Sequence, residues 1–256
     1  MIMHSARREI IRDLLQTTPY LSLHELEERF PEVSSMTLRR DIEYFEKEGE
    51  AIKVRGGARS MKFITTSMED AFNQRLKKNT GAKEKIAERA IEMIETGRSI
   101  FLDSGTTVQY LAERLPDERL TITTTGLNIA MALMNKSRPL VNIVGGMLNR
   151  DSVSVSGSQA IQFLDEINID VAFIVPSGIS GRSGLTSGNY IECELKKMIV
   201  DKADKVVVLM DSSKLDKSLP YTFCTLEKVD TIITDDELSY DVQKKAMEYG
   251  VEVIIA

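Results

Sequence analysis

The chain has 256 residues, of which 42% are hydrophobic and 28% are charged, which is enough for one large domain and a smaller one. This composition excludes a disordered chain, and no apolar run approaches the roughly 18 residues of a membrane helix. Charged residues interrupt residues 1–15, unlike a secretory signal, so we expect a cytoplasmic protein with no membrane partner. Two cysteines and two histidines without zinc-like spacing predict no structural metal, and we expect no cofactor.

The net charge of -6 argues against a nucleic-acid partner, because phosphate contacts need local positive charge. The basic residues are nevertheless clustered. Around a pair of adjacent glycines, a stretch without acidic residues carries Lys53, Arg55, Arg59 and Lys62. We therefore predict a small domain over residues 1–60, a polar linker over 61–74 and a second domain over 75–256.

Apolar residues at helical spacing predict three short helices in the first domain, followed by a hairpin. Ser22 and Glu25 form a capping box ahead of the second helix. The third helix follows a short break, and its apolar stripe is Leu38, Ile42 and Phe45. This arrangement is typical of a helix-turn-helix, whose second helix enters the DNA major groove, and the basic hairpin that follows would form a wing.

The outward face of the third helix is the predicted DNA-contacting surface. Arginine can pair with guanine or hold a phosphate, and threonine can do either. A solvated helix face is the alternative interpretation of an isolated pair of arginines, but the helical spacing and the basic wing together favour double-stranded DNA. The candidate contacts are Ser35, Met36, Thr37, Arg39, Arg40, Tyr44, Lys53 and Arg55.

The segment SSMTLRRDI from Ser34 to Ile42, with KVRGGA from Lys53 to Ala58, resembles the DeoR family of bacterial transcriptional regulators. The match extends along almost the whole chain. In that family the Thr-x-Arg-Arg-Asp helix reads the operator, so the resemblance implies contact roles for Thr37, Arg39 and Arg40. The family more often has a histidine before the two glycines, where Arg55 stands here.

From Ser99 onward, short β-branched runs alternate with helical patterns, which is typical of an α/β domain. Ligands of such domains bind beyond the carboxyl ends of the strands, and small polar residues gather at these ends here. A single cluster is more often a strand-to-helix turn with an N-cap, but several that converge predict a pocket for a phosphosugar. Its predicted residues are Asp103, Ser104, Gly105, Thr106, Thr107, Thr123, Thr124, Thr125, Asn128, Gly145, Gly146, Ser177, Gly178, Glu192 and Lys214.

The same motifs recur in DeoR-type sensor domains: Asp-x-Gly-Thr-Thr, the Gly-Gly pair, the stretch from Ser177 to Thr186, and Asp-Ser-Ser-Lys. The resemblance implies a fold similar to ribose-5-phosphate isomerase and coenzyme A transferases, and a phosphorylated sugar as effector. Val175-Pro176 departs from the Gly-Ala-like pair that is usual in the family, and proline removes an N–H from the pocket wall.

One predicted helix carries Glu192, Glu194, Lys196 and Lys197. We expect these residues to be solvated or paired with one another, and the alternative is that Glu192 or Lys196 lines the pocket. Cys193 is expected to be a packed thiol, because no histidine in this domain could activate it.

The preferred hypothesis is a repressor of a carbohydrate-utilisation operon whose operator affinity is switched by a phosphorylated sugar. An isomerase-like enzyme that processes a phosphosugar is the alternative, with Asp103, Asp211 or Glu192 as general base. An actin-like sugar kinase is a third interpretation, but the second domain is too short for two such lobes. A single winged domain buries too little DNA surface, so we expect a homo-oligomer, dimer or tetramer, assembled by the second domain.

Overall fold

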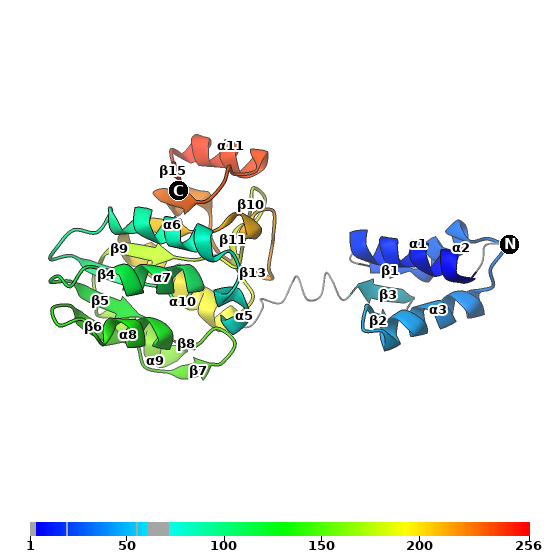
Figure 1. Ribbon diagram of the computed structural model, residues 1–256, viewed down its shortest axis with the longest axis horizontal. Helices are drawn as coiled ribbons and strands as arrows, with labels where there is room; N and C mark the ends of the chain where they lie inside the picture. Colours follow the sequence, from blue (N-terminus) through cyan, green and yellow to red (C-terminus); the bar gives the residue numbers. More distant parts are fainter. Residues whose placement is uncertain (1–3, 19, 55, 61–71) are drawn as a thin grey trace. The chain divides into compact units, whose positions relative to one another are not determined.

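The structure is a computed structural model that describes residues 4–18, 20–54, 56–60 and 72–256 (Figure 1). The chain divides into two compact units between Glu69 and Asp70, inside the predicted linker. The elements of the first unit are α1 (His4–Thr17), β1 (Tyr20–Ser22), α2 (Leu23–Arg29), α3 (Ser35–Lys47), β2 (Ala51–Val54) and β3 (Gly57–Ser60). The predicted helices and hairpin are confirmed, and the short strand β1, which we did not predict, completes an antiparallel sheet in the order β1-β3-β2.

The first unit is a winged helix-turn-helix around one apolar core. The predicted capping box is present: Ser22 Oγ accepts a hydrogen bond from the Glu25 N–H (3.1 Å), and the Glu25 carboxylate accepts one from the Ser22 N–H (2.8 Å). The core gathers buried side chains from all three helices, among them Ile11, Leu26, Phe30, Leu38 and Phe45. These contacts hold α3 at a fixed angle across α2.

The two adjacent glycines of the wing serve different purposes. Gly56 has a φ of +88°, in the left-handed region that turns the chain between β2 and β3. Gly57 pairs with Ser22 of β1, and a Cβ on Gly57 would lie 2.2 Å from the carbonyl oxygen of Leu21. Only glycine therefore allows β1 to join the wing.

A buried ion network joins α3 to α1. The carboxylate of Asp41 is 1% exposed and accepts hydrogen bonds from Arg7 Nε (2.6 Å) and Arg8 Nε (3.0 Å). Near the other end of α1, Arg12 binds Glu50 through both Nε and Nη2 at 2.8 Å. Together these contacts fix the direction in which the outward face of α3 points.

The second unit is an α/β domain, as predicted. Its elements are α5 (Phe72–Leu76), α6 (Thr80–Ile91), β4 (Ser99–Leu102), α7 (Thr106–Arg114), β5 (Thr121–Thr124), α8 (Leu127–Leu133), β6 (Leu140–Ile143), β7 (Met147–Asn149), β8 (Ser154–Ser156), α9 (Ser158–Asp165), β9 (Ile169–Ile174), β10 (Gly178–Ser180), β11 (Gly184–Ser187), α10 (Tyr190–Lys202), β12 (Ala203–Leu209), β13 (Tyr221–Cys224), β14 (Thr231–Thr234), α11 (Tyr240–Tyr249) and β15 (Glu252–Ile255), with short 3-10 turns at Ser212–Lys214 and Leu226–Lys228.

A parallel seven-stranded sheet forms the centre of this domain, in the order β15-β14-β12-β9-β4-β5-β6. Helices α6, α7 and α8 bury their apolar residues against one face, and α9, α10 and α11 bury theirs against the other. A small antiparallel sheet, β10-β11-β13, packs with the second group, and β7 and β8 form a separate hairpin. Each face of the central sheet is therefore covered, as parallel sheets require.

The order of the strands reverses between β4 and β9. From β4 the chain proceeds outward to β5 and β6 by way of α7 and α8, whereas β9 lies on the other side of β4 and leads through α10 to β12. Because these crossover helices cover opposite faces, the loops after β4 and β9 diverge and leave a crevice. This switch point is where ligands of open α/β sheets bind.

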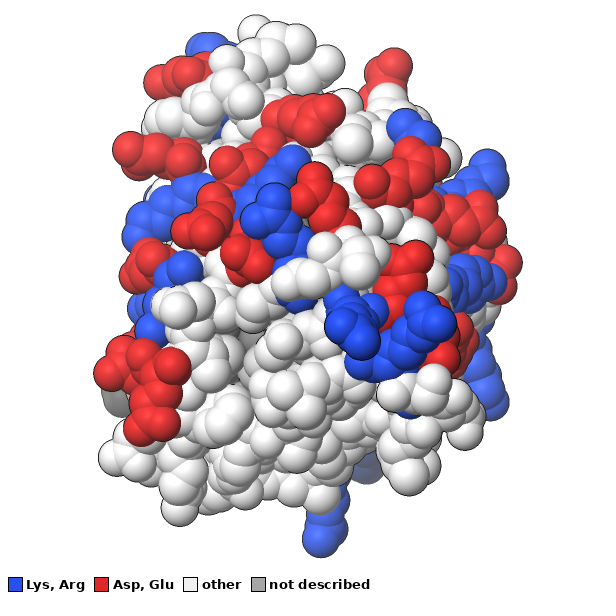
Figure 2. All heavy atoms as spheres, turned by 90° about the vertical axis from the view of Figure 1, so that its left-hand side faces the viewer, with Lys and Arg blue, Asp and Glu red and all other residues white. Residues whose placement is uncertain are grey.

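Charged side chains are unevenly distributed over the second unit. Figure 2 shows positive and negative residues intermixed over the upper part of one face, whereas the lower central part is largely uncharged, with an acidic cluster at its left margin. No helix in the described ranges combines the length and the apolar character that a bilayer crossing requires.

Replacing Asp41 by asparagine is expected to destabilise the first unit by about 3–5 kcal/mol, because Arg7 would stay buried beside a neutral amide. Calorimetric unfolding of the full chain would measure the loss. The control is Asp201→Asn, which removes an exposed carboxylate paired with Lys228, and it is expected to change the unfolding curve little. An unchanged transition in Asp41→Asn would contradict the anchoring role of this residue.

Candidate DNA interface and ligand site

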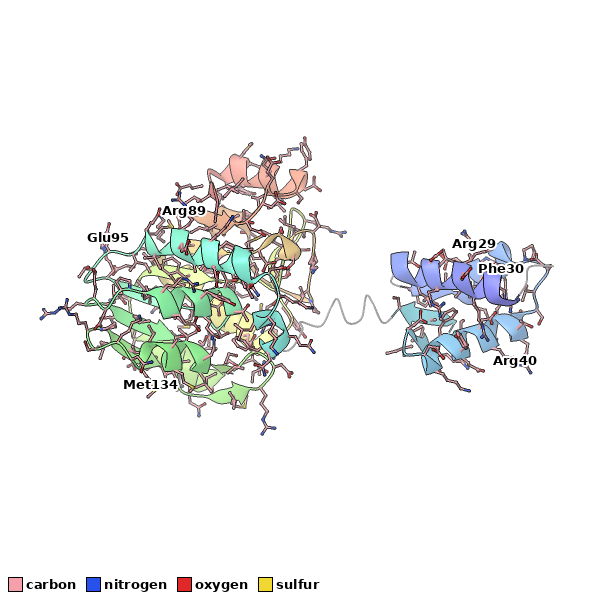
Figure 3. All side chains as sticks on the ribbon, in the orientation of Figure 1. Arg29, Phe30, Arg40, Arg89, Glu95 and Met134 are labelled. Carbon is pink, nitrogen blue, oxygen red and sulfur yellow. The ribbon has the colours of Figure 1, made fainter. Side chains whose placement is uncertain are left out.

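The third helix presents the predicted DNA-contacting surface on a capped, well-anchored element. Ser34 is the N-cap of α3, and its Oγ accepts a hydrogen bond from the Thr37 N–H (3.3 Å). Arg39, Arg40 and Met36 are exposed, and Met36 is 63% exposed although it is apolar. Figure 3 shows Arg40 projecting outward from α3. An exposed arginine pair beside an exposed apolar residue suits a groove of DNA, where base edges offer both acceptors and methyl groups.

Two predicted contact residues are partly engaged within the protein. The Thr37 hydroxyl lies 3.0 Å from the Ser34 hydroxyl, and Thr37 is half-buried. The Tyr44 ring is also half-buried, because the Arg8 guanidinium stacks over it at 3.7 Å from the ring centroid and Phe45 meets its edge. Tyr44 therefore contributes to the support of the helix as well as to its outward side.

The positive charge of Lys53 in the wing is paired with an acidic residue of α3. Lys53 Nζ lies 2.6 Å from Glu43 Oε1 of α3, and the Lys53 N–H donates to Glu46 Oε1 at 3.0 Å. The ammonium of Lys53 holds the pKa of Glu43 below its usual value. A DNA phosphate must compete with Glu43 for this lysine. Arg55, the other predicted wing contact, lies outside the described residues.

The predicted ligand site lies at the switch point of the central sheet. A cavity there is lined by residues that follow β4 and β5, by the hairpin strand β8 and by one side of α10, namely Asp103, Ser104, Thr125, Ser154, Val155, Ser156, Glu192, Leu195 and Lys196. Its volume is only about 10 Å³. Since a single water needs roughly 10–15 Å³ of such space, the cavity is too narrow for a sugar phosphate in this conformation.

A buried ion pair forms the floor of this cavity. Lys196 Nζ of α10 lies 2.7 Å from Asp103 Oδ2 and 2.6 Å from the carbonyl oxygen of Val175, after β9. Asp103 also accepts hydrogen bonds from the Ser104 N–H (2.8 Å) and the Val175 N–H (3.0 Å). The Lys196 ammonium lies 5.3 Å from the ring centroid of Phe223. The pair thus ties together β4, β9 and α10.

A second buried carboxylate faces the same cavity. Glu192 Oε1 accepts hydrogen bonds from Ser152 Oγ (2.5 Å), Ser154 Oγ (2.6 Å) and Asn149 Nδ2 (3.0 Å). Asn149 and Ser154 belong to β7 and β8, so Glu192 holds the hairpin against α10. The expectation that Glu192 and Lys196 are solvated is wrong, because both are buried, whereas Glu194 and Lys197 do form an exposed pair at 2.7 Å.

Of the predicted ligand residues, Asp103, Ser104, Thr125 and Glu192 line this cavity, and the others do not. Ser104, Gly105, Thr106 and Thr107 form the buried turn into α7, and Gly105 packs closely against Val175. Thr124 is committed to the fold, since its hydroxyl donates to the Leu102 carbonyl (2.7 Å) and accepts from the Gly126 N–H (3.0 Å). The other buried positions are Thr123, Ser177 and Gly178, while Gly145 and Gly146 are exposed.

Asn128 does not line the cavity at Asp103. It lines a separate open groove between α7 and α8, where its Nδ2 donates to Gln109 Oε1 at 3.1 Å. This groove also includes Glu113, Met131 and Lys136.

Lys214 lies outside this cavity, in a second polar cluster that also contains Lys83, Asn79 and Asp211. This cluster follows β12, and β9 separates β12 from β4 in the sheet. Burial lowers the pKa of Lys83 to about 8, although the charge of Asp211 opposes this change. Lys83 Nζ donates to the carbonyl oxygens of Lys78 (2.6 Å) and Arg75. Burial raises the pKa of Asp211, but hydrogen bonds from Ser213 and Asn79 and the charge of Lys214 outweigh it, so the pKa lies below its usual value.

Cys193 is packed, as expected. It is 1% exposed, and burial raises the pKa of its thiol, so the reactive thiolate is scarce at neutral pH.

Comparison with known proteins agrees with this architecture. The domain family described as "DeoR C terminal sensor domain" matches residues 78–236, and the family described as "DeoR-like helix-turn-helix domain" matches residues 7–63. The chain belongs to the DeoR family of transcriptional regulators. The resemblance inferred from the third helix and the strand-end motifs is thereby confirmed.

Several DeoR-family relatives match along nearly their full length. The HTH-type transcriptional regulator GolR of Listeria innocua is 31% identical, covering 98% of this chain and 98% of the relative. The HTH-type transcriptional regulator IolR of Bacillus subtilis is 32% identical, covering 92% and 93%. The glycerol-3-phosphate regulon repressor of Escherichia coli K12 is 27% identical, covering 96% and 97%.

Two solved structures are similar in part. Ribose 5-phosphate isomerase A from Methanocaldococcus jannaschii aligns with a TM-score of 0.40 and 22% identity, covering 54% of this chain and 55% of that chain. eIF2B delta from Chaetomium thermophilum aligns with a TM-score of 0.46 and 17% identity, covering 65% and 60%.

Sequence reasoning missed several residues of this DeoR-type site. Ser154 and Ser156 lie on a three-residue strand of the hairpin, too short for a periodic signal. Outside the cavity, in the second polar cluster, Lys83 lies in α6, whose mixed composition did not indicate a buried lysine. The sequence offers Lys196 only as an alternative pocket residue, because charged residues on a helix are usually solvated or paired with one another.

Replacing Glu43 by glutamine is expected to raise operator affinity severalfold at low salt, because Lys53 would then be released to bind a phosphate. When the binding constant is measured over a range of salt concentrations, the plot of its logarithm against the logarithm of the salt concentration should be steeper by about one unit, because one more phosphate is neutralised. The control is the double mutant Glu43→Gln/Lys53→Met, in which the gain should largely vanish. Equal gains with and without Lys53 would contradict the masking role of Glu43.

Proposed function

We propose that this chain is a transcriptional repressor of a carbohydrate-utilisation operon and that a phosphorylated sugar lowers its affinity for operator DNA. The observation that carries the proposal is the polar cavity at the switch point, which lies in the same chain as an exposed arginine face on a helix-turn-helix. The glycerol-3-phosphate regulon repressor, a relative over nearly the full length, has a name that pairs repression with a phosphorylated polyol.

The cavity suits a polyhydroxylated anion. Asp103 and Glu192 are acceptors for hydroxyl groups, and the serines of β8 can both donate and accept. Lys196 supplies a positive charge, and the N–H groups at the start of α7 can face a phosphate. Since Lys196 is already bonded to Asp103, a ligand that enters must rearrange this pair, which provides a difference between bound and free states.

Regulation rather than catalysis is the function that we propose for this site. Asp103 is held by a lysine and by two backbone N–H groups, and three side-chain donors hold Oε1 of Glu192, so contacts within the protein fix the orientation of both carboxylates. A general base needs an available lone pair directed at the substrate proton. Absence of turnover of ribose 5-phosphate and related esters at high protein concentration would support this interpretation, whereas measurable turnover would contradict it.

Arg40→Ala is expected to weaken operator binding by about 1–3 kcal/mol, because a groove-facing arginine loses its contacts to bases or phosphates. Fluorescence anisotropy of the DNA upstream of the chain's own operon, at near-physiological salt, would measure it. The matched control is Arg89→Ala on α6, an exposed arginine paired with Glu92 in the other unit (Figure 3). Wild-type affinity in Arg40→Ala would refute the assigned DNA surface.

The same anisotropy assay identifies the effector when sugar phosphates and their unphosphorylated parents are added. One phosphate ester is expected to release the DNA. Glu192→Gln should raise the effector concentration for half release by about 10- to 100-fold, because hydrogen bonds to a charged group are worth roughly 1.5–3 kcal/mol. Operator affinity without effector should remain close to wild type, whereas the melting temperature should fall, because Glu192 also holds the β7–β8 hairpin.

Glu194→Gln is the control, since this exposed carboxylate lies two residues away and pairs with Lys197. If Glu192→Gln and Glu194→Gln change the effector concentration for half release equally, the effector does not bind in this cavity. Release by the unphosphorylated parent alone would reject the phosphorylated class of ligand.

A further inference from the structure

An apolar surface lies at one edge of the central sheet, over α8, β6 and β7. We call it the β6 edge surface, and its exposed residues are Met131, Met134, Leu140, Ile143, Met147 and Leu148. Met134 is 79% exposed and Leu140 is 63% exposed. Figure 3 shows Met134 at the lower margin of the unit, and Figure 2 shows that the lower central part of one face is largely uncharged.

The strand beneath this surface has an open edge. β6 is the last strand of the sheet and, among the described residues, pairs with β5 alone. Residues 139–149, which include all of β6 and β7, contain no charged residue. Proteins usually protect such edges with charges, bulges or covering elements, because unpaired backbone groups beside apolar side chains associate with other chains. This edge lacks the charged protection.

The opposite edge of the same sheet differs. β15 contains Glu252, and the exposed Met247 of α11 lies among Lys244, Lys245 and Glu248. Both edges expose apolar residues, but the β15 edge carries the charges that keep a solvated edge from associating.

We propose that a second copy of this chain docks on the β6 edge surface, so that the two β6 strands pair antiparallel across a two-fold axis. The two sheets would then continue into one another. Such an interface is isologous, because the same residues line both sides of it.

Charge favours the antiparallel arrangement. Lys136 and Arg138 lie just before β6, whereas the turn after the strand is Gly145-Gly146. In an antiparallel pair the basic end of one strand meets the uncharged end of the other, whereas a parallel pair would place the two arginines side by side.

The size of the surface agrees with a dimer. Six side chains of this kind, each about half exposed or more, present roughly 300–400 Å² of apolar area. A standard interface buries about 800 Å² per partner, of which somewhat more than half is apolar. The exposed side chains therefore supply most of the apolar area that a stable pair of copies requires.

The interface would also adjoin the ligand cavity. Leu148 of β7 stands opposite Val155 of β8, and Val155 lines the cavity. Glu192 binds Asn149 and Ser154 of the same hairpin. One short hairpin thus has its apolar strand on the β6 edge surface and its serine strand in the cavity.

Sedimentation velocity of the full chain, without DNA or sugar phosphate, tests the proposal independently of the proposed function. The wild type is expected to sediment as a dimer or a tetramer at micromolar concentration. Ile143→Lys should halve the mass and raise the dissociation constant at least about hundredfold, because it would place a charge inside the apolar interface. Met134→Lys on α8 leaves the strand sequence intact and should act in the same direction, so it serves if Ile143→Lys does not fold.

The matched control is Met247→Lys, which introduces the same charge at an equally exposed methionine on α11 and should leave the mass unchanged. A monomeric wild type would overturn the proposal and leave the surface to a different macromolecule. Loss of association in Met247→Lys, with wild-type mass in the two β6 edge variants, would overturn it in favour of the β15 edge.

Discussion

The buried pair of Asp103 and Lys196 is the interaction on which the second unit's site depends. Two opposite charges are held away from water, and each is bonded further to the backbone around Val175. Removing one partner would leave an uncompensated buried charge, so the pair is retained only if the sheet places β4 beside β9 and α10 across their ends. The order of the strands in the sheet and the charged groups of the cavity therefore depend on each other.

The first unit uses the same device for a different purpose. Asp41 follows directly after the two exposed arginines of α3, yet it is buried and bonded to Arg7 and Arg8. One acidic residue thus fixes the helix from behind while the preceding residues face outward. The potential at the outward side of α3 depends on which charged side chains are exposed there, so a protein with a net charge of -6 can still present a basic surface.

Much of the architecture could be predicted from the sequence, because helical stripes and β-branched runs are local signals. The face on which a charged residue lies is not local. Lys196 and Glu192 are buried by contacts with β4 and with the β7–β8 hairpin, dozens of residues away in the chain. Similarly, the stacking of Arg8 on Tyr44 depends on how α1 crosses α3, which helical periodicity within α3 cannot reveal.

The small volume of the cavity has a kinetic consequence. If the proposed effector binds here, the cavity must first widen, so only the widened fraction of molecules is competent to bind. The apparent affinity is reduced by that fraction, and at high ligand concentration the observed rate approaches the rate of opening. The time the cavity takes to widen would then set how quickly a change in effector concentration reaches the DNA-binding unit.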